Sequence, residues 1–355
     1  MKALVILHRH YIKGFPKKGG FDYILEELIN NNYELDVIEH PIEIYNSKSK
    51  FKKIKLKPPF IFIFEFFKNI FLVIKRNKKY DLIISSDPLN FLPTYFFKKF
   101  NYCKKLYFHS VDYSPSRFDN LIFEFLYQRL YKFAIKNADL TSVVSKRVHD
   151  KFKFIAKNMI IRRNIPIIPN IKFRAIDKRN KDILLISEKF TDHLETENIL
   201  SLVKKLVKTY KTIKLIIIGL PDTEFKENVK KLNLEKNIIY KGFLSREEVF
   251  KEISKNYIGL SWYSNKDSHI HFGDSLKIRE YLACGLPVVC DNLTSTSEEV
   301  KSNHLGYVCT DVDDFYNKMI RLIKDKKEYK VCINNIIKYN GKNLNENINA
   351  VLERS

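Results

Sequence analysis

Short apolar runs alternate with longer amphipathic stretches along almost the whole chain. The stretches have the spacing of helices, as in Phe21–Asn30, Asn120–Lys136 and Ile199–Thr209. The apolar runs are rich in β-branched residues and predict strands that are buried on both faces. They form two series along the chain: Ala3–Leu7, Leu35–Ile38, Leu82–Ser85, Leu106–His109 and Leu140–Val144, then Ile183–Ile186, Ile213–Gly219, Ile238–Tyr240, Ile258–Ser261 and Val288–Cys290. This alternation predicts an α/β fold with parallel sheets covered by helices.

The two series are separated by Arg162–Lys181, a segment without a clear period that contains two prolines and many charges. A chain of 355 residues is also longer than a single hydrophobic core usually organises. We therefore predict two Rossmann-like domains, residues 1–170 and 171–335, whose strand-to-helix loops face each other across a cleft. Residues 336–355 are expected to form a C-terminal helix that returns towards the first domain.

The composition, with 45% hydrophobic and 29% charged residues, is typical of a globular protein. The apolar run at the N-terminus is too short for a signal peptide, so we interpret it as a buried strand. The five cysteines contain no CxxC pair and no zinc spacing, which predicts reduced thiols in a cytoplasmic protein.

The formal net charge is +22 at pH 7. One explanation is a compositional bias, because Lys, Asn and Ile are all abundant. The other is a partner such as an anionic membrane surface or a phosphorylated small molecule. No RNA-binding aromatic signature, paired Cys/His finger or basic heptad region is visible, so a nucleic-acid partner is not expected.

The stretch from Gly273 to Val289 predicts a short helix. Ser275 can cap its start, Gly285 can end it, and Pro287 prevents its continuation into the next strand. The free backbone N–H groups at a helix N-terminus, here from Leu276 onwards, suit a diphosphate.

Two charged side chains lie on one face of this predicted helix. Lys277, in the first turn, is suited to bound phosphate, and Glu280, one turn later, can accept hydrogen bonds from two ribose hydroxyls. An ordinary capped helix with a surface lysine and glutamate is the alternative interpretation.

The segment resembles the nucleotide-binding motif of GT-B glycosyltransferases, especially family 4, in which P-x-K-x-x-E-Y-x-A-x-G-x-P-V-V recurs. Ser275 stands at the proline position. The positions that fit are Lys277, Glu280, Tyr281, Ala283, Gly285, Pro287, Val288 and Val289. The family's more familiar motif has a second glutamate where this chain has Phe272, and Asp274 is the nearby acid that could substitute for it.

Other segments extend the resemblance over most of the chain. Ile213–Gly219 followed by proline is similar to the family's strand and loop L-V-I-V-G-x-G-P, and Ile238–Ser245 is similar to V-x-F-x-G-F-V-S. Glu298 matches a late E-I-V element. Gly19 and Gly20 match the glycine pair that opens the first helix. The resemblance implies a GT-B fold with a nucleotide-sugar donor.

The resemblance also implies which groups carry the chemistry. Similar enzymes use a basic pair after the first strand of the second domain to stabilise charge on the leaving diphosphate. This chain has Glu188 at the arginine position and no Lys-Gly after it, so Lys189 or Lys277 is the expected cation. The same difference leaves open a catalytically silent subunit that binds a nucleotide sugar. A nucleotide-sugar epimerase is a further alternative.

In the first domain, His109 ends a predicted strand at the point where similar enzymes place a histidine near the reacting sugar. Asp112 could orient this histidine or bind the acceptor, and a purely structural histidine is the alternative. His8 and His10, at the end of the first strand, are expected to contact the acceptor.

No metal and no cofactor are expected. The chain has no Asp-x-Asp motif in a suitable loop, and His269 and His271 would point to opposite faces of an extended segment. Asp311–Asp314 predicts an N-cap cluster instead. Retention of anomeric configuration and independence from metal are implied by the resemblance.

Pro58–Ile74 is rich in phenylalanine and isoleucine but is interrupted by Glu65, Lys68 and Asn69, so it does not predict a membrane-spanning helix. As a helix it has a narrow polar stripe, which continues to Lys75 and Arg76. It lies between two groups of lysines, Lys52, Lys53, Lys55 and Lys57 before it and Lys78 and Lys79 after it. Such a helix could lie on an anionic membrane surface, or its phenylalanines could pack on the first sheet.

Together these features predict a hexosyltransferase that moves a sugar from a nucleotide-sugar donor to a glycan or lipid-linked acceptor. The expected role is in surface polysaccharide or glycolipid synthesis. The expected location is the cytoplasm or the inner face of the cell membrane.

Overall fold

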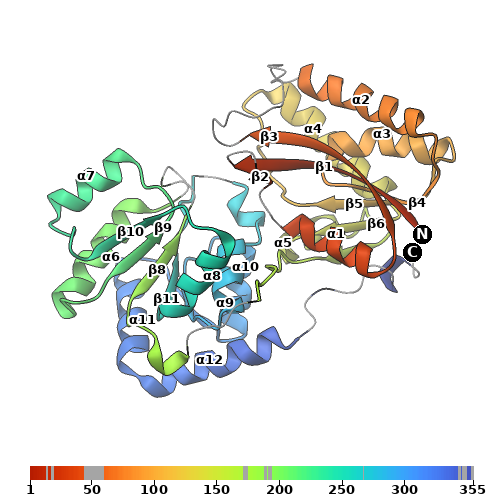
Figure 1. The fold of residues 1–355 in the computed structure, drawn as a ribbon. Helices are drawn as coiled ribbons and strands as arrows, with labels where there is room; N and C mark the ends of the chain where they lie inside the picture. Colours follow the sequence, from red (N-terminus) through yellow and green to blue (C-terminus); the bar gives the residue numbers. More distant parts are fainter. Residues whose placement is uncertain are drawn as a thin grey trace. The chain divides into compact units, whose positions relative to one another are not determined.

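The computed structural model describes residues 1–12, 15–16, 20–43, 60–170, 175–187, 190, 194–266, 268–342, 345 and 350–352. The chain divides into two compact units, Met1–Asn164 with Leu344–Ser355, and Ile165–Asn343 (Figure 1). The division lies inside the segment that the sequence marks as a linker. The predicted start of a C-terminal helix at residue 336 is wrong, because that position lies within α12 (Lys326–Asn340) of the second unit.

The sheet of the first unit has six parallel strands in the order β3-β1-β4-β5-β6-β7, and a short seventh strand, β2, pairs antiparallel with the end of β1. Their bounds are β1 Lys2–Ile12, β2 Phe15–Pro16, β3 Glu34–Glu43, β4 Tyr80–Ser85, β5 Cys103–Ser110, β6 Leu140–Val143 and β7 Met159–Ile161. The helices among the described residues are α1 Gly20–Asn30, α2 Phe60–Arg76, α3 Pro88–Lys99, α4 Leu121–Asn137 and α5 Lys146–Phe152.

The second unit has a parallel sheet in the order β10-β9-β8-β11-β12-β13. Its strands are β8 Ile183–Ile186, β9 Leu215–Ile218, β10 Ile238–Gly242, β11 Ile258–Ser261, β12 Val288–Cys290 and β13 Gly306–Val308. Besides α12, the described helices are α6 Thr196–Thr209, α7 Thr223–Lys231, α8 Arg246–Lys255, α9 Leu276–Ala283, α10 Ser295–Ser302 and α11 Val312–Lys324. The predicted α/β fold with two Rossmann-like domains is confirmed. That their loops face each other across a cleft stays a prediction.

Local signals in the sequence define several element ends. Ser245 and Glu248 form a capping box at the start of α8. The carboxylate of Asp311 accepts hydrogen bonds from the backbone N–H groups of Asp313 and Asp314, so the predicted N-cap of α11 is confirmed. The five cysteines are free and buried, as expected of reduced thiols.

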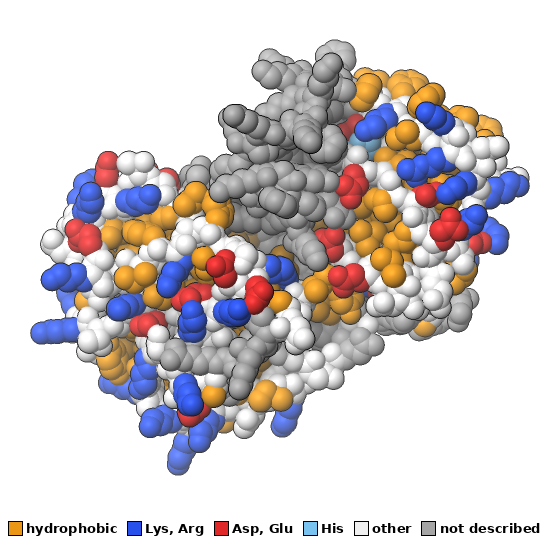
Figure 2. All heavy atoms as spheres, in the orientation of Figure 1, with side chains coloured by type: hydrophobic (Ala, Val, Ile, Leu, Met, Phe, Trp, Pro, Cys, Tyr) orange, Lys and Arg blue, Asp and Glu red, His pale blue; other side chains and the backbone are white. Residues whose placement is uncertain are grey.

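Helix α2 buries part of its polar stripe, Glu65 and Asn69, together with Val73. Asn69 is fully buried and Glu65 is largely buried, whereas Ile63, Phe64, Phe67, Phe71 and Ile74 are each 44–63% exposed. The hypothesis that the phenylalanines fill the contact with the sheet is therefore wrong for these side chains. Figure 2 shows hydrophobic and basic side chains together over the part of the first unit where Figure 1 places α2 and α3. Among the described residues, no helix is both long and apolar enough to cross a membrane.

Candidate functional site

Helix α9 is fixed against the sheet of the second unit by Tyr281. The ring of Tyr281 packs so closely on Gly259 of β11 that a Cβ there would lie 2.5 Å from a ring carbon. The buried hydroxyl accepts a hydrogen bond from the Ile186 N–H at 2.9 Å and donates to the Leu260 carbonyl at 3.2 Å. These bonds attach the helix to the carboxyl ends of β8 and β11. The helix ends at Gly285, whose φ of +67° suits glycine, as the sequence predicts.

Ser275 occupies the N-cap position of α9, but its side chain makes no capping hydrogen bond. Its Oγ lies 2.9 Å from the hydroxyl of Tyr263, and its own N–H donates to Oγ1 of Thr296 at 2.7 Å. The prediction that the Ser275 hydroxyl caps the helix is therefore wrong. Lys277, in the first turn after Leu276, has its ammonium 4.2 Å from the centroid of the Tyr263 ring, a cation–π contact.

Asp291, which the sequence did not predict as a site residue, holds the loops beside the start of α9. It follows the last residue of β12 and accepts hydrogen bonds from the N–H groups of Tyr263 and Leu293, both at 2.7 Å. Burial raises the pKa of Asp291, while these hydrogen bonds and the charge of Lys277 oppose that rise. An acid at the carboxyl end of a parallel strand was the signal that could have identified it.

Glu280 is buried rather than an ordinary surface glutamate. Its Oε1 accepts a hydrogen bond from Nη1 of Arg246 at 3.1 Å. Arg246 is the first residue of α8, and its Nε also donates to the Ile167 carbonyl at 3.2 Å. The sequence did not predict this partner, because 34 positions separate the two residues. The role of Glu280 in binding ribose stays a prediction.

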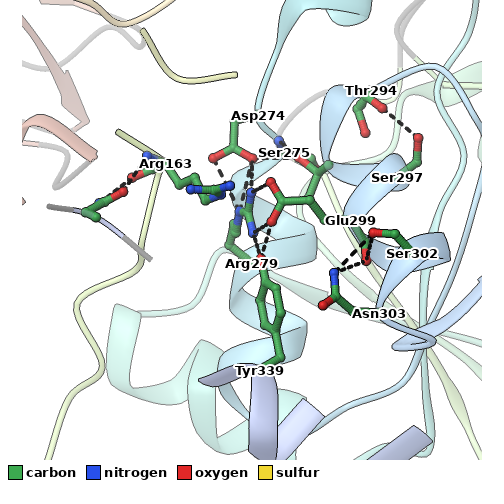
Figure 3. Close-up of polar contacts among 12 residues, drawn as sticks. Arg163, Asp274, Ser275, Arg279, Thr294, Ser297, Glu299, Ser302, Asn303 and Tyr339 are labelled. Atoms are coloured by element: carbon green, nitrogen blue, oxygen red, sulfur yellow. Dashed lines mark hydrogen bonds and ion pairs between the residues drawn. The ribbon is translucent and has the colours of Figure 1, made fainter. Parts of the chain in front are cut away.

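A buried arginine connects the loop before α9 to two other helices (Figure 3). Arg279 donates to Asp274 at 2.7 Å and to Glu299 of α10 at 3.0 Å, and it also hydrogen-bonds the Tyr339 hydroxyl of α12. Asp274 additionally accepts a hydrogen bond from Thr296 at 2.7 Å. The Asp274 side chain is 1% exposed, so the expectation that it replaces the missing donor-binding glutamate is wrong. It instead positions the start of α9.

The N-terminus of α10 lies next to the start of α9, because the Ser295 N–H donates to the Gly273 carbonyl at 3.2 Å. Thr294 is the N-cap residue, and its buried Oγ1 has no hydrogen-bond partner among the described residues. Glu298, a predicted donor contact, is an exposed residue of the first turn of α10. Two helix N-termini therefore adjoin at this edge of the second unit, which favours an anionic ligand.

His109 of the first unit is buried at the end of β5. Its Nδ1 lies 2.6 Å from Oγ of Ser142, which in turn lies 2.6 Å from the Tyr107 hydroxyl. Burial, reinforced by the positive charge of Arg162, lowers the pKa of His109 to about 3. The imidazole is thus neutral at physiological pH. If Tyr107 donates to Ser142 and Ser142 donates to Nδ1, the ring proton lies on Nε2.

Asp112 does not orient His109, contrary to one of the two expectations for it. Its carboxylate is 55% exposed and pairs with Arg117 at 3.2 Å. Ser142, on the neighbouring strand β6, contacts the histidine instead. The hypothesis that Asp112 contacts the acceptor stays a prediction.

His8 lies between two carboxylates, with Nδ1 2.9 Å from Asp87 and Nε2 3.0 Å from Glu65. Burial alone would lower its pKa, but hydrogen bonds to Asp87 and Glu65 outweigh that effect and raise the pKa to about 10. Both ring nitrogens are therefore occupied within the protein. The expectation that His8 contacts the acceptor stays a prediction.

Several predicted residues can be placed only in part. Gly19 and Lys189 lie outside the described residues. Gly20 begins α1, and His10 is a residue of β1, but only their backbone is described. His271 lies in a 3₁₀ turn, Ile270–Phe272, and not in an extended strand as assumed. Among the described residues, no group of three or more His, Cys, Asp or Glu side chains could hold a metal ion.

Residues 168–339 match the family model of "Glycosyl transferases group 1". This range contains α9, α10 and the groups described around them, so the similarity to that family lies in the second unit. Two curated relatives are 27% identical: Glucosyltransferase 3 of Streptococcus parasanguinis over 136 residues and Protein CapJ of Staphylococcus aureus over 183 residues. These matches span 38% and 50% of this chain, and 38% and 44% of the relatives' own lengths.

Solved structures show that the whole chain has the GT-B arrangement of elements. Sucrose-phosphate synthase from Thermosynechococcus elongatus matches with a TM-score of 0.69 at 13% identity, covering 99% of this chain and 96% of that one. Anabaena HepE, solved in complex with UDP, matches with a TM-score of 0.66 at 15% identity, covering 100% and 98%. The predicted GT-B fold is confirmed.

Proposed function

We propose that this chain is a glycosyltransferase that moves a sugar from a nucleotide-sugar donor to a glycan or lipid-linked acceptor. The observation that carries the proposal is the group 1 domain over residues 168–339, with Lys277 in the first turn of α9 beside the start of α10. The proposed reaction retains the anomeric configuration and needs no metal, as in the family 4 enzymes that the motif resembles. Its product would enter a surface polysaccharide or glycolipid, on the cytoplasmic face of the cell membrane.

The proposed donor site is suited to stabilise negative charge on the diphosphate of the donor. When the bond between the anomeric carbon and the diphosphate breaks, negative charge develops on the leaving diphosphate. The ammonium of Lys277, held over the Tyr263 ring, and the backbone N–H groups at the starts of α9 and α10 are suited to stabilise that charge. Structural neighbours solved with UDP, such as HepE, support the binding of a nucleoside diphosphate group at this proposed site.

The direct test is a thermal-shift panel of UDP-, GDP- and ADP-sugars with the full chain. The proposal expects at least one to raise the unfolding temperature and to be consumed when an acceptor is supplied. Binding without transfer to any acceptor would support the silent subunit instead. Conversion of the donor to its epimer without transfer would support the epimerase. A panel in which no nucleotide sugar binds would reject all three.

Replacing Glu280 with alanine is expected to weaken donor binding by about 2–4 kcal/mol, because a charged acceptor of two ribose hydrogen bonds is lost. Calorimetry with a donor that the parent binds measures the effect. Arg246→Met is the matched control, since it removes the observed ion pair at 3.1 Å but keeps the carboxylate. Equal losses in both variants would assign Glu280 a purely structural role, and an unchanged affinity would remove it from the site.

Replacing His109 with alanine is expected to reduce turnover about a hundredfold or more, while donor affinity changes little. A neutral imidazole with its proton on Nε2 can donate a hydrogen bond to the reacting sugar, but it cannot act as an acid at neutral pH when its pKa is about 3. The pH profile of turnover should therefore show no titration of His109 between about pH 5 and 8. Ser142→Ala, which removes the contact to Nδ1 but keeps the ring, should give an intermediate loss. Full activity of His109→Ala would make the histidine structural.

A further inference from the structure

The inward side of α2 is held by a closed set of polar contacts, which we call the anchor network. Its members are His8, His40, Glu65, Asn69, Asp87 and Asn90. Two of them belong to α2: Glu65 pairs with His8 at 3.0 Å, and Asn69 bonds to His40 at 2.9 Å and to Asn90 at 2.8 Å. The network thus connects α2 to β1, β3 and α3.

This network fixes how α2 is rotated about its axis. Rolling the helix so that its phenylalanines met the sheet would remove Glu65 and Asn69 from their partners and leave the charged His8 ring with only one of its two carboxylates. Uncompensated charges and unsatisfied amides below the surface are costly. The polar contacts of Glu65 and Asn69 therefore make the apolar side chains of Ile63, Phe67 and Ile74 face outwards.

Two neighbouring helices add to the same layer. Helix α3 packs against both α2 and α4, and it contributes the exposed side chain of Phe96, with Phe100 directly after it (Figure 1). The first two turns of α4 expose Leu121, Ile122, Phe125 and Leu126, each by 50–85%. We call the exposed apolar side chains of α2, α3 and α4 the α2–α4 surface. Apolar patches of this kind on several elements mark an interaction site.

Basic side chains border the α2–α4 surface. At helical spacing, Lys68 and Lys75 lie at one edge of the α2 stripe, with the Lys75 ammonium 6.0 Å from the Phe71 ring. On α4, the exposed face continues from the apolar turns to Arg129, Lys132 and Lys136. Aromatic and aliphatic side chains bordered by lysine and arginine suit the boundary between acyl chains and anionic headgroups.

We propose that the α2–α4 surface docks on an anionic lipid bilayer, with the phenylalanines of α2 entering the acyl boundary and the basic side chains meeting the headgroups. A second copy of this chain is a poorer occupant, because its own lysines and arginines would face those of the first copy. The inference rests on the proposed function only in that the acceptor is membrane-borne. It assigns the contact to named side chains of the first unit.

The test is cosedimentation of the full chain with vesicles of phosphatidylcholine alone or mixed with phosphatidylglycerol, at low and high salt. We expect binding to the anionic vesicles that weakens as salt rises and leaves a salt-resistant part from the inserted apolar side chains. Phe67→Asn/Phe71→Asn should remove that part and lower the partition coefficient at least about tenfold. Lys68→Gln/Lys75→Gln should lower the salt-sensitive part instead.

The matched control is Val331→Asn/Ile337→Asn, two exposed apolar positions on α12 of the second unit, which should leave vesicle binding unchanged. Failure of the parent protein to bind anionic vesicles at low salt would overturn the inference. So would binding that is insensitive to Phe67→Asn/Phe71→Asn, or a dimer in solution that this double variant abolishes.

Donor binding, measured by calorimetry on the same preparations, separates the two proposals. Donor binding and transfer without vesicle binding would reject only the docking surface. Vesicle binding without affinity for any nucleotide sugar would reject only the proposed function.

Discussion

Replacing Arg279 with methionine is expected to lower the free energy of unfolding of the second unit by about 3–5 kcal/mol. The guanidinium is 3% exposed and lies between Asp274 and Glu299, whose carboxylates would remain without their cation. Chemical denaturation of the full chain, read at the transition of the second unit, measures the loss. Two units can unfold in separate steps, so the two transitions are fitted separately.

The matched control is Arg321→Met. Arg321 also pairs with a glutamate, Glu328 at 3.1 Å, but its side chain is 54% exposed, so the variant should lower the free energy of unfolding far less than Arg279→Met. Similar losses for the two variants would mean that the buried cluster does not hold α9. If the cluster does hold it, Arg279→Met should also weaken donor binding, because the start of α9 would lose its connection to α10 and α12.

The sequence predicted the strands of the second unit most closely. Ile183–Ile186, Ile258–Ser261 and Val288–Cys290 have the observed bounds, because a parallel strand buried on both faces is an unbroken apolar run. The bounds of α9 were also predicted from Ser275 and Gly285, since the end of a helix depends on local backbone chemistry.

Side-chain partners could not be predicted in the same way. Ser142 lies 33 positions from His109, and Arg246 lies 34 positions from Glu280, so only the folded sheet brings them together. Asp274 is an example of a role predicted without knowledge of its partner. Its position beside the donor motif favoured a contact with the ligand, but its carboxylate forms an ion pair with the buried Arg279.

The orientation of α2 could not be predicted for the same reason, because it depends on side chains that are distant in the sequence. Helical spacing separates the polar side of α2 from its apolar side, but it does not say which side meets the sheet. The ordinary rule puts the apolar side inwards. Here Glu65 and Asn69 meet His8 and His40, which come from β1 and β3, and these polar partners decide the orientation.

Replacing His8 with leucine is expected to lower the free energy of unfolding of the first unit by about 3–5 kcal/mol near neutral pH, because Glu65 and Asp87 would lose the cation between them. His149→Leu is the control, since His149 pairs with Asp150 at 3.4 Å on the surface and should cost less than about 1 kcal/mol.

The stabilisation that His8 contributes is expected to depend on pH. The pKa of His8 is about 10 in the folded protein, against an ordinary value of 6.5 when unfolded. A raised pKa means that the folded state holds the proton more tightly, so the stabilisation is complete below about pH 6.5 and is lost as the pH rises towards 10. The charged neighbours of His8 are Glu65 of α2 and Asp87 at the start of α3, with His40 of β3 beside them.

The difference in stability between parent and His8→Leu should therefore be largest near pH 6 and should narrow steadily between about pH 7 and 10. Urea denaturation at a series of pH values, with His149→Leu measured in parallel, gives this curve directly. A difference that stays constant over the range would mean that His8 is neutral in the folded protein. The anchor of α2 would then be a set of hydrogen bonds without a buried cation.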